Sequence, residues 1–95
     1  MKIYPAAEQD LLGIIDYLNT RSAEAALQYY DPLTEQIASL SHMPNRCPRP
    51  KDLALAAKGY CYLIVRDCLV FYVVVEDTVQ IRRILYGRRD YLSLL

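Results

Sequence analysis

The sequence has few of the residues from which enzyme sites are usually built. It contains one histidine, His42, and no tryptophan among its 95 residues. It has no phosphate-binding P-loop, no GxGxxG, no HExxH and no Ser-His-Asp set. Its three cysteines, Cys47, Cys61 and Cys68, lack CxxC spacing, and with a single histidine they do not suggest a zinc site. We therefore expect no metal and no cofactor.

The three cysteines also bear on the redox state of the protein. Their spacing permits a disulfide between Cys61 and Cys68, but disulfides are rare in a reducing cytoplasm. Free cysteine is among the most buried residue types. We expect plain thiols that are buried or half-buried.

Long hydrophobic runs are absent as well. No apolar stretch approaches the roughly 18–20 residues that span a bilayer, and the first residues, from Met1 to Pro5, do not form a signal peptide. A length of 95 residues suits one domain, because domains usually have about 100–200 residues. The sequence predicts a single cytoplasmic domain over residues 1–95 that binds no membrane.

The chain has no net charge, with 11 basic and 11 acidic residues, which argues against a general nucleic-acid binder. The charges are unevenly placed, however. Residues 1–45 carry two basic and six acidic residues, whereas residues 46–95 carry nine and five. Four arginines and no acid fall within residues 78–89: Arg82, Arg83, Arg88 and Arg89. A local positive patch of this kind can bind phosphate or an acidic partner.

The first half of the sequence predicts a short strand and two helices. Lys2–Tyr4 is expected to be an edge strand that ends at Pro5. Helical spacing of Leu11, Leu12, Ile14, Ile15 and Leu18 predicts a helix from Ala6, followed by a turn over residues 19–22. A second helix is expected from about Ala23 to Leu40, with Ser22 as its N-cap. Because Pro32 lacks an N–H and clashes with the preceding turn, we expect a kink or a restart there.

The second half predicts a loop and three strands. Prolines at 44, 48 and 50 indicate a loop over residues 41–52. The strands expected are Tyr60–Arg66, Cys68–Val75 and Thr78–Leu85, joined by tight turns as an antiparallel meander. The middle strand carries no charge, which predicts a central position with both faces buried. Gly87 ends the last strand, and Arg88–Leu95 is expected to be a short helix or tail.

These elements together predict an α+β fold. Their order is β-α-α-β-β-β, with a helical hairpin packed on one face of the sheet. The adjacent residues Arg82 and Arg83 would point to opposite faces of a regular strand. One of them must therefore reach under the helices, pair with an acid or lie at a bulge. Because an unpaired buried charge is costly, we expect one of them to bind Asp10 or Asp16 of the first helix.

Several stretches of the sequence resemble one known family. Gly59-Tyr60, Leu69–Tyr72 and Val79–Tyr91 resemble the RelE/ParE superfamily of toxins from type II toxin–antitoxin (plasmid stabilisation) systems. The first helix, from Ala7 to Tyr17, and the segment Ile37–Leu40 agree with it too. The resemblance covers essentially the whole chain. It implies the same β-α-α-β-β-β fold and a toxin that inhibits growth until a cognate antitoxin binds it.

The resemblance implies two alternative activities. ParE-like members inhibit DNA gyrase, whereas RelE-like members are mRNA interferases that cleave mRNA on the ribosome without a metal. The ribonucleases commonly carry an arginine in the central strand where this sequence has Leu69, and Cys61 replaces another expected arginine. These two differences favour the ParE-like branch, in which the chain inhibits gyrase by binding. A decayed toxin that only binds antitoxin is a third alternative.

Each activity implies its own site residues. For a gyrase inhibitor, the target-binding residues expected are Arg82, Arg83, Tyr86, Arg88 and Arg89. For a ribonuclease that uses the ribosome and mRNA as its target, the catalytic candidates are Arg66, Arg83, Arg89 and Tyr91. In both cases the partner is a cognate antitoxin, and either a homodimer or a toxin–antitoxin hetero-oligomer fits the resemblance.

Overall fold

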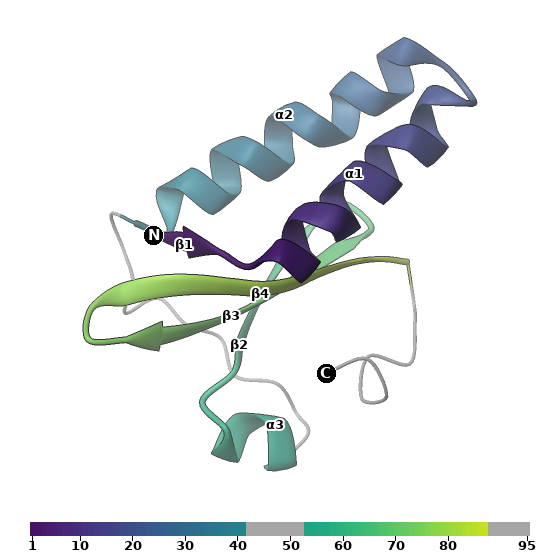
Figure 1. Cartoon of the computed structure of the whole chain (residues 1–95). Helices are drawn as coiled ribbons and strands as arrows, with labels where there is room; N and C mark the ends of the chain where they lie inside the picture. The colour runs from purple at the N-terminus through teal and green to yellow at the C-terminus, as the bar shows by residue number, and fades with distance from the viewer. Residues whose placement is uncertain (42–52, 88–95) are drawn as a thin grey trace.

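Two helices lie together on one side of a four-stranded sheet in the computed structural model, which describes residues 1–41 and 53–87 (Figure 1). The strands and helices are β1 (Lys2–Ile3), α1 (Pro5–Asn19), α2 (Ala23–Ser39), α3 (Leu53–Ala57), β2 (Cys61–Val65), β3 (Cys68–Val75) and β4 (Thr78–Tyr86). This arrangement confirms the predicted α+β fold with a helical hairpin. The short helix α3 is an addition that the sequence pattern did not predict.

Two sequence-based predictions lie outside the described residues. One is the proline-rich loop beyond Ser41, and the other is the C-terminal helix or tail from Arg88 onward. None of the helices within the described residues is long and apolar enough to cross a membrane.

The sheet has the order β1-β4-β3-β2. Strands β2, β3 and β4 form the predicted antiparallel meander, and β1 pairs in parallel with β4, which places Lys2 beside Gln80. The uncharged strand β3 is central, as predicted, and begins and ends at the expected residues. The hairpin between β3 and β4 turns at Glu76 and Asp77, which both have the positive φ angles of a tight two-residue turn.

Both long helices begin where the sequence provides a start signal. Pro5 occupies the first turn of α1, where the missing N–H has no cost. The Ser22 hydroxyl caps α2 by accepting a hydrogen bond from the backbone N–H of Ala25 at 2.9 Å. Of the two outcomes predicted at Pro32, a kink or a restart, the restart is wrong, because α2 runs through the proline as one helix. Leu33 and Ile37, which follow the proline, are buried, and this packing offsets the lost hydrogen bond.

The cysteines only partly follow the prediction. Cys68 is a free, fully buried thiol, and burial raises its pKa to about 11. The disulfide between Cys61 and Cys68 that the spacing permits is therefore not formed. Cys61 is nevertheless disulfide-bonded, so the prediction of a plain thiol is wrong at this position. That prediction rested on the cellular compartment and took no account of which sulfur atoms the fold brings together.

Candidate functional site

Arg83 is bound to the first helix. Its guanidinium donates to both carboxylate oxygens of Asp10 on α1, from Nε at 2.7 Å and from Nη2 at 2.9 Å. The same carboxylate accepts the backbone N–H of Ile84 at 2.9 Å. Asp10 therefore ties α1 to strand β4 through three hydrogen bonds. The predicted salt bridge between this arginine pair and the first helix is confirmed, and it involves Arg83.

Arg82 takes a different direction because β4 contains a bulge. Ile81 pairs with Tyr72 and Arg83 with Phe71, so Arg82 has no partner in the register of the two strands. Its guanidinium lies over the ring of Tyr4, 4.4 Å from the ring centroid, and donates to the Gln80 side chain at 3.3 Å. The bulge thus separates the roles of two adjacent arginines, as one of the three sequence-based alternatives expected.

A small cluster of four residues forms around the Tyr4 ring, which we call the Lys2–Arg82 cluster. It consists of Lys2 and Tyr4 from the N-terminal strand and its end, and Gln80 and Arg82 from β4. The Lys2 amine lies 5.2 Å from the ring centroid, and the Tyr4 hydroxyl donates to the Gln80 side chain at 3.1 Å. The cluster brings two positive charges to one aromatic ring.

No acid neutralises the Lys2–Arg82 cluster within residues 1–41 and 53–87. The one salt bridge there joins Arg83 to Asp10. Moreover, Nε of Arg82 is shielded from solvent and has no hydrogen-bond partner in this part of the chain. A shielded donor without a partner costs about 1–3 kcal/mol. The fold therefore holds Arg82 in a position whose charge and hydrogen-bonding capacity are only partly used.

Three tyrosine rings pack together where β4 ends, and we call them the tyrosine cluster. Tyr86 lies between Tyr17 of α1 and Tyr29 of α2, with ring centroids 6.1 and 5.8 Å away. The Tyr29 hydroxyl donates to Asp67 at 2.7 Å, and this bond, together with burial, raises the pKa of Tyr29 above its usual range. The backbone N–H of Gly87 donates to the Asp67 carbonyl at 2.8 Å. These contacts fix the last described residue before Arg88.

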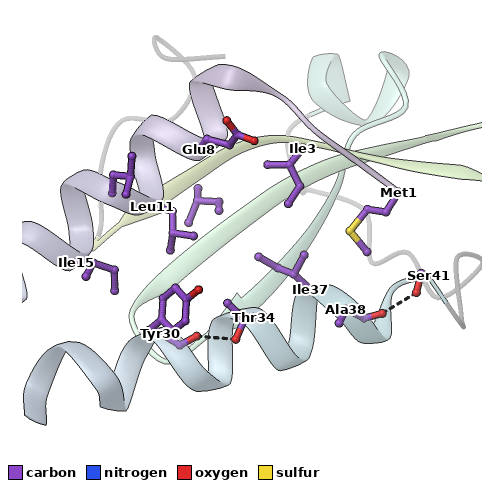
Figure 2. Close-up of a pocket in the computed structure, with 12 residues that line it drawn as sticks. Met1, Ile3, Glu8, Leu11, Ile15, Tyr30, Thr34, Ile37, Ala38 and Ser41 are labelled. Carbon is purple, nitrogen blue, oxygen red and sulfur yellow. Dashed lines mark hydrogen bonds between the residues drawn. The ribbon is translucent and has the colours of Figure 1, made fainter.

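A hydrophobic groove of about 720 Å³ opens between α1 and α2 beside β1. Figure 2 shows Leu11 and Ile15 from α1 facing Tyr30 and Ile37 from α2, with Ile3 and Met1 near one end. Within the described residues, nine large hydrophobic side chains are exposed, and four of these line this groove: Met1, Ile3, Leu12 and Tyr30. Leu12 is 64% exposed. Apolar exposure gathered in one hollow is typical of a binding surface.

The structure brings together only part of the predicted target-binding set. Arg82 and Arg83 are adjacent but contact different side chains, and Tyr86 faces the two helices. Arg88 and Arg89 lie outside the described residues. Sequence reasoning did not predict the groove or the role of Lys2. The available signal was the excess of apolar residues on α1, where Leu11, Leu12, Ile14, Ile15 and Leu18 are too many for one buried stripe.

The ribonuclease candidates are also dispersed where they can be seen. Arg66 lies in the turn between β2 and β3 and stacks on the Tyr29 ring at 5.6 Å, whereas Arg83 binds Asp10. Arg66 lies in the turn just before Cys68, which pairs with Tyr86, whereas Arg83 pairs with Phe71. These two pairs are three residues apart along the strands, so on the order of 10 Å separates Arg66 from Arg83 in that direction. Arg89 and Tyr91 lie outside the described residues.

Comparisons with known proteins agree with one another. The family model described as the ParE toxin of the type II toxin–antitoxin system parDE matches residues 1–91. Among solved structures, a chain of the chromosomal ParDE toxin–antitoxin system from P. aeruginosa has a similar fold, with a TM-score of 0.76 and 24% sequence identity. The similarity covers 92% of this chain and 94% of that one. No curated protein matches the sequence.

Proposed function

Because the chain belongs to the ParE toxin family of type II toxin–antitoxin systems, we propose that it inhibits DNA gyrase by binding it and that a cognate antitoxin prevents this. The match of the family model over residues 1–91 is the observation that carries the proposal. Inhibition by binding needs no catalytic group. This suits a chain in which the described arginines are engaged by tyrosine rings or by Asp10.

The central strand supports the gyrase proposal over mRNA cleavage. The arginine that RelE-like ribonucleases commonly carry there is replaced by Leu69. Leu69 pairs with Ile64 of β2 on one side and Leu85 of β4 on the other. This position therefore lies in a row of three aliphatic residues. Such a row offers no charge to stabilise the pentacovalent phosphate of RNA cleavage.

The target-binding residues of this proposal are the arginines at the C-terminal side, Arg88 and Arg89. They follow Gly87, whose position is fixed by its hydrogen bond to Asp67 and by the tyrosine cluster. Arg82, Arg83 and Tyr86 were also predicted to bind the target. Arg83 and Tyr86 contact the helices, so we assign them a structural role in which they hold β4 against α1 and α2.

The antitoxin of this proposal lies in the groove between α1 and α2. Its lining is apolar apart from Glu8, Thr34 and Ser41, so it suits the apolar face of an amphipathic segment. Its volume of about 720 Å³ is within the usual range of about 300–1,000 Å³ for binding pockets. Four exposed apolar side chains would be buried on binding. The toxin therefore uses its helices for the antitoxin and its C-terminal arginines for the target.

The experiment that tests the proposed activity is pulse labelling of DNA and protein synthesis after induction of the toxin alone. We expect DNA synthesis to fall first and purified gyrase to lose supercoiling activity on addition of the protein. Arg89→Ala should lower the potency at least about tenfold and change the unfolding temperature by no more than a few degrees. The matched control is Arg21→Ala, an exposed arginine in the turn after α1.

The alternatives predict different results in the same experiment. An earlier fall in protein synthesis would overturn the gyrase proposal in favour of ribosome-dependent mRNA cleavage. If neither synthesis falls while the protein is soluble and binds its antitoxin, the chain is a decayed toxin. A large loss of stability in Arg89→Ala would show that this arginine has a structural role.

A further inference from the structure

The Lys2–Arg82 cluster is a second polar feature that neither gyrase inhibition nor the groove explains. It has two cations and no acid within the described part of the chain. Both cationic groups lie within 5.2 Å of the centroid of the same Tyr4 ring. Two like charges near one ring repel each other, and an anion bound beside them relieves this repulsion. The cluster therefore has the charge of an anion site.

The geometry of Arg82 also suits an anion site. The Tyr4 ring and the Gln80 side chain hold the guanidinium in one orientation before any ligand binds. A planar guanidinium in a fixed orientation can donate two parallel hydrogen bonds to a carboxylate or phosphate. Pre-organisation lowers the entropy lost on binding. Gln80 is itself held by the Tyr4 hydroxyl and by the pairing of Lys2 with Gln80 in the sheet.

The position of the cluster indicates which anion it takes. In and around β1, Met1 and Ile3 line the apolar groove, whereas Lys2 and Tyr4 belong to the cluster. Because successive residues of a strand point to opposite faces, the groove and the cluster lie on the two sides of one edge strand. A polypeptide that leaves the groove across β1 meets Lys2 and Arg82 next.

The surrounding charge favours a carboxylate of a protein over the phosphates of a nucleic acid. Glu8 lines the groove, and its backbone N–H donates to the Tyr4 carbonyl at 3.0 Å, so this acid lies one helical turn from the cluster. A nucleic acid backbone, which has a negative charge at every phosphate, would be repelled along this surface. A peptide with apolar residues followed by a single acid is not repelled in this way.

We propose that Lys2 and Arg82 bind an aspartate or glutamate carboxylate of the antitoxin, located just after the apolar segment that lies in the groove. This inference rests on the proposed function only in that it needs an antitoxin in the groove. It adds a charge requirement to the antitoxin sequence and a second, polar contact to the complex. The bound antitoxin partly desolvates the two cations and the carboxylate. Loss of this contact therefore raises the dissociation rate more than it lowers the association rate.

The experiment measures the affinity of the purified cognate antitoxin for the full-length toxin and its variants at low and at high ionic strength. We expect Arg82→Gln to weaken binding about 10–50-fold and Lys2→Gln about 3–10-fold, with a smaller salt dependence in both. Arg21→Gln is the matched control, because this arginine also lies over a tyrosine ring, that of Tyr17, at 5.8 Å. It should change the affinity less than twofold. Thermal unfolding of each variant shows whether weaker binding comes from the lost contact or from a loss of the fold. Lys2 is exposed, so Lys2→Gln remains a folded test even if Arg82→Gln unfolds.

A charge exchange identifies the partner of the cluster. Arg82→Glu should abolish tight binding, and replacing the proposed antitoxin acid with lysine should restore part of it. If both Arg82→Gln and Lys2→Gln bind the antitoxin like the wild type, the inference is wrong. If the same variants instead lose binding to a DNA duplex and keep the antitoxin affinity, the anion is a nucleic acid phosphate and the inference is also wrong. Failure of the wild-type toxin to bind any antitoxin would contradict the proposed function itself.

Discussion

The tyrosine cluster and the groove with its neighbouring cations differ in how fully their side chains are partnered. In the tyrosine cluster, the rings of Tyr17 and Tyr29 both contact Tyr86, and the Tyr29 hydroxyl and the Gly87 N–H both donate to acceptors on Asp67. In the groove, large apolar side chains are exposed, and beside it two cations lack an acid within the described residues. The first region stabilises the fold, and we propose that the second binds the antitoxin.

The same contrast exists between two adjacent residues. Arg83 makes a two-pronged contact with Asp10, whereas Arg82 stacks on Tyr4 and has one shielded nitrogen without a partner. A bulge in β4 produces the difference. Residue type alone therefore does not distinguish a structural arginine from a binding one; the carboxylate within reach does.

The largest expected effect comes from a charge placed in the groove. Leu12→Asp puts a carboxylate where the antitoxin is proposed to bury an apolar face, and we expect the affinity to fall more than about 100-fold, which corresponds to about 3 kcal/mol. The stability of the free toxin should hardly change, because Leu12 is 64% exposed. Titration calorimetry measures the affinity. Leu27→Asp is the control, since Leu27 is similarly exposed on α2 and does not line the groove; equal losses in the two variants would contradict the assignment.

A smaller effect is expected from the contact that closes α1 onto β4. Asp10→Ala removes the carboxylate that accepts from the Arg83 guanidinium and the Ile84 N–H, and we expect a loss of about 2 kcal/mol in the free energy of unfolding. For a chain of this size the unfolding temperature should fall by on the order of 10 °C. Asp16→Ala, an exposed acid on the same helix, should change it little. Calorimetry measures the unfolding of both variants. If Asp10→Ala is as stable as Asp16→Ala, the salt bridge contributes nothing to the stability of the fold.

The smallest effect is expected at the tyrosine cluster. Tyr29→Phe removes the hydrogen bond to Asp67 and should cost about 1 kcal/mol in the free energy of unfolding. Because the fold raises the pKa of Tyr29, this contribution is complete below the unfolded-state pKa of about 10 and is lost as the pH rises above it. Urea unfolding should show that the difference in the free energy of unfolding between wild type and variant is smaller at alkaline than at neutral pH. Tyr30→Phe serves as the control, and a difference that does not depend on pH would contradict the assignment.

The strands could be predicted from the sequence because their signals are local. The uncharged run from Cys68 to Val75 and the tight turn at Glu76-Asp77 define the hairpin without reference to the rest of the chain. The restart at Pro32 was predicted wrongly for the opposite reason. The local cost of the proline is outweighed by the packing of Leu33 and Ile37, which only the fold reveals.

The binding features depend on contacts between residues that are far apart in the sequence. The Lys2–Arg82 cluster exists because β1 pairs in parallel with β4, and nothing near Lys2 in the sequence indicates that pairing. The groove depends on the space between α1 and α2, which helical periodicity does not determine. The salt bridge of Arg83 was predictable as one of a few pairings, since two adjacent arginines in a strand require a partner for one of them.

Hydrogen–deuterium exchange of the toxin, alone and bound to its antitoxin, would test directly whether the antitoxin binds the groove and leaves the tyrosine cluster free. We expect new protection on binding in α1, in β1 and in the segment from Tyr30 to Ser41 at the end of α2, which line the groove. The turn at Arg66-Asp67 and the end of β4 at Tyr86 should exchange as in the free toxin. Protection confined to that turn and strand end, with α1 and α2 unchanged, would contradict the assignment of the groove to the antitoxin.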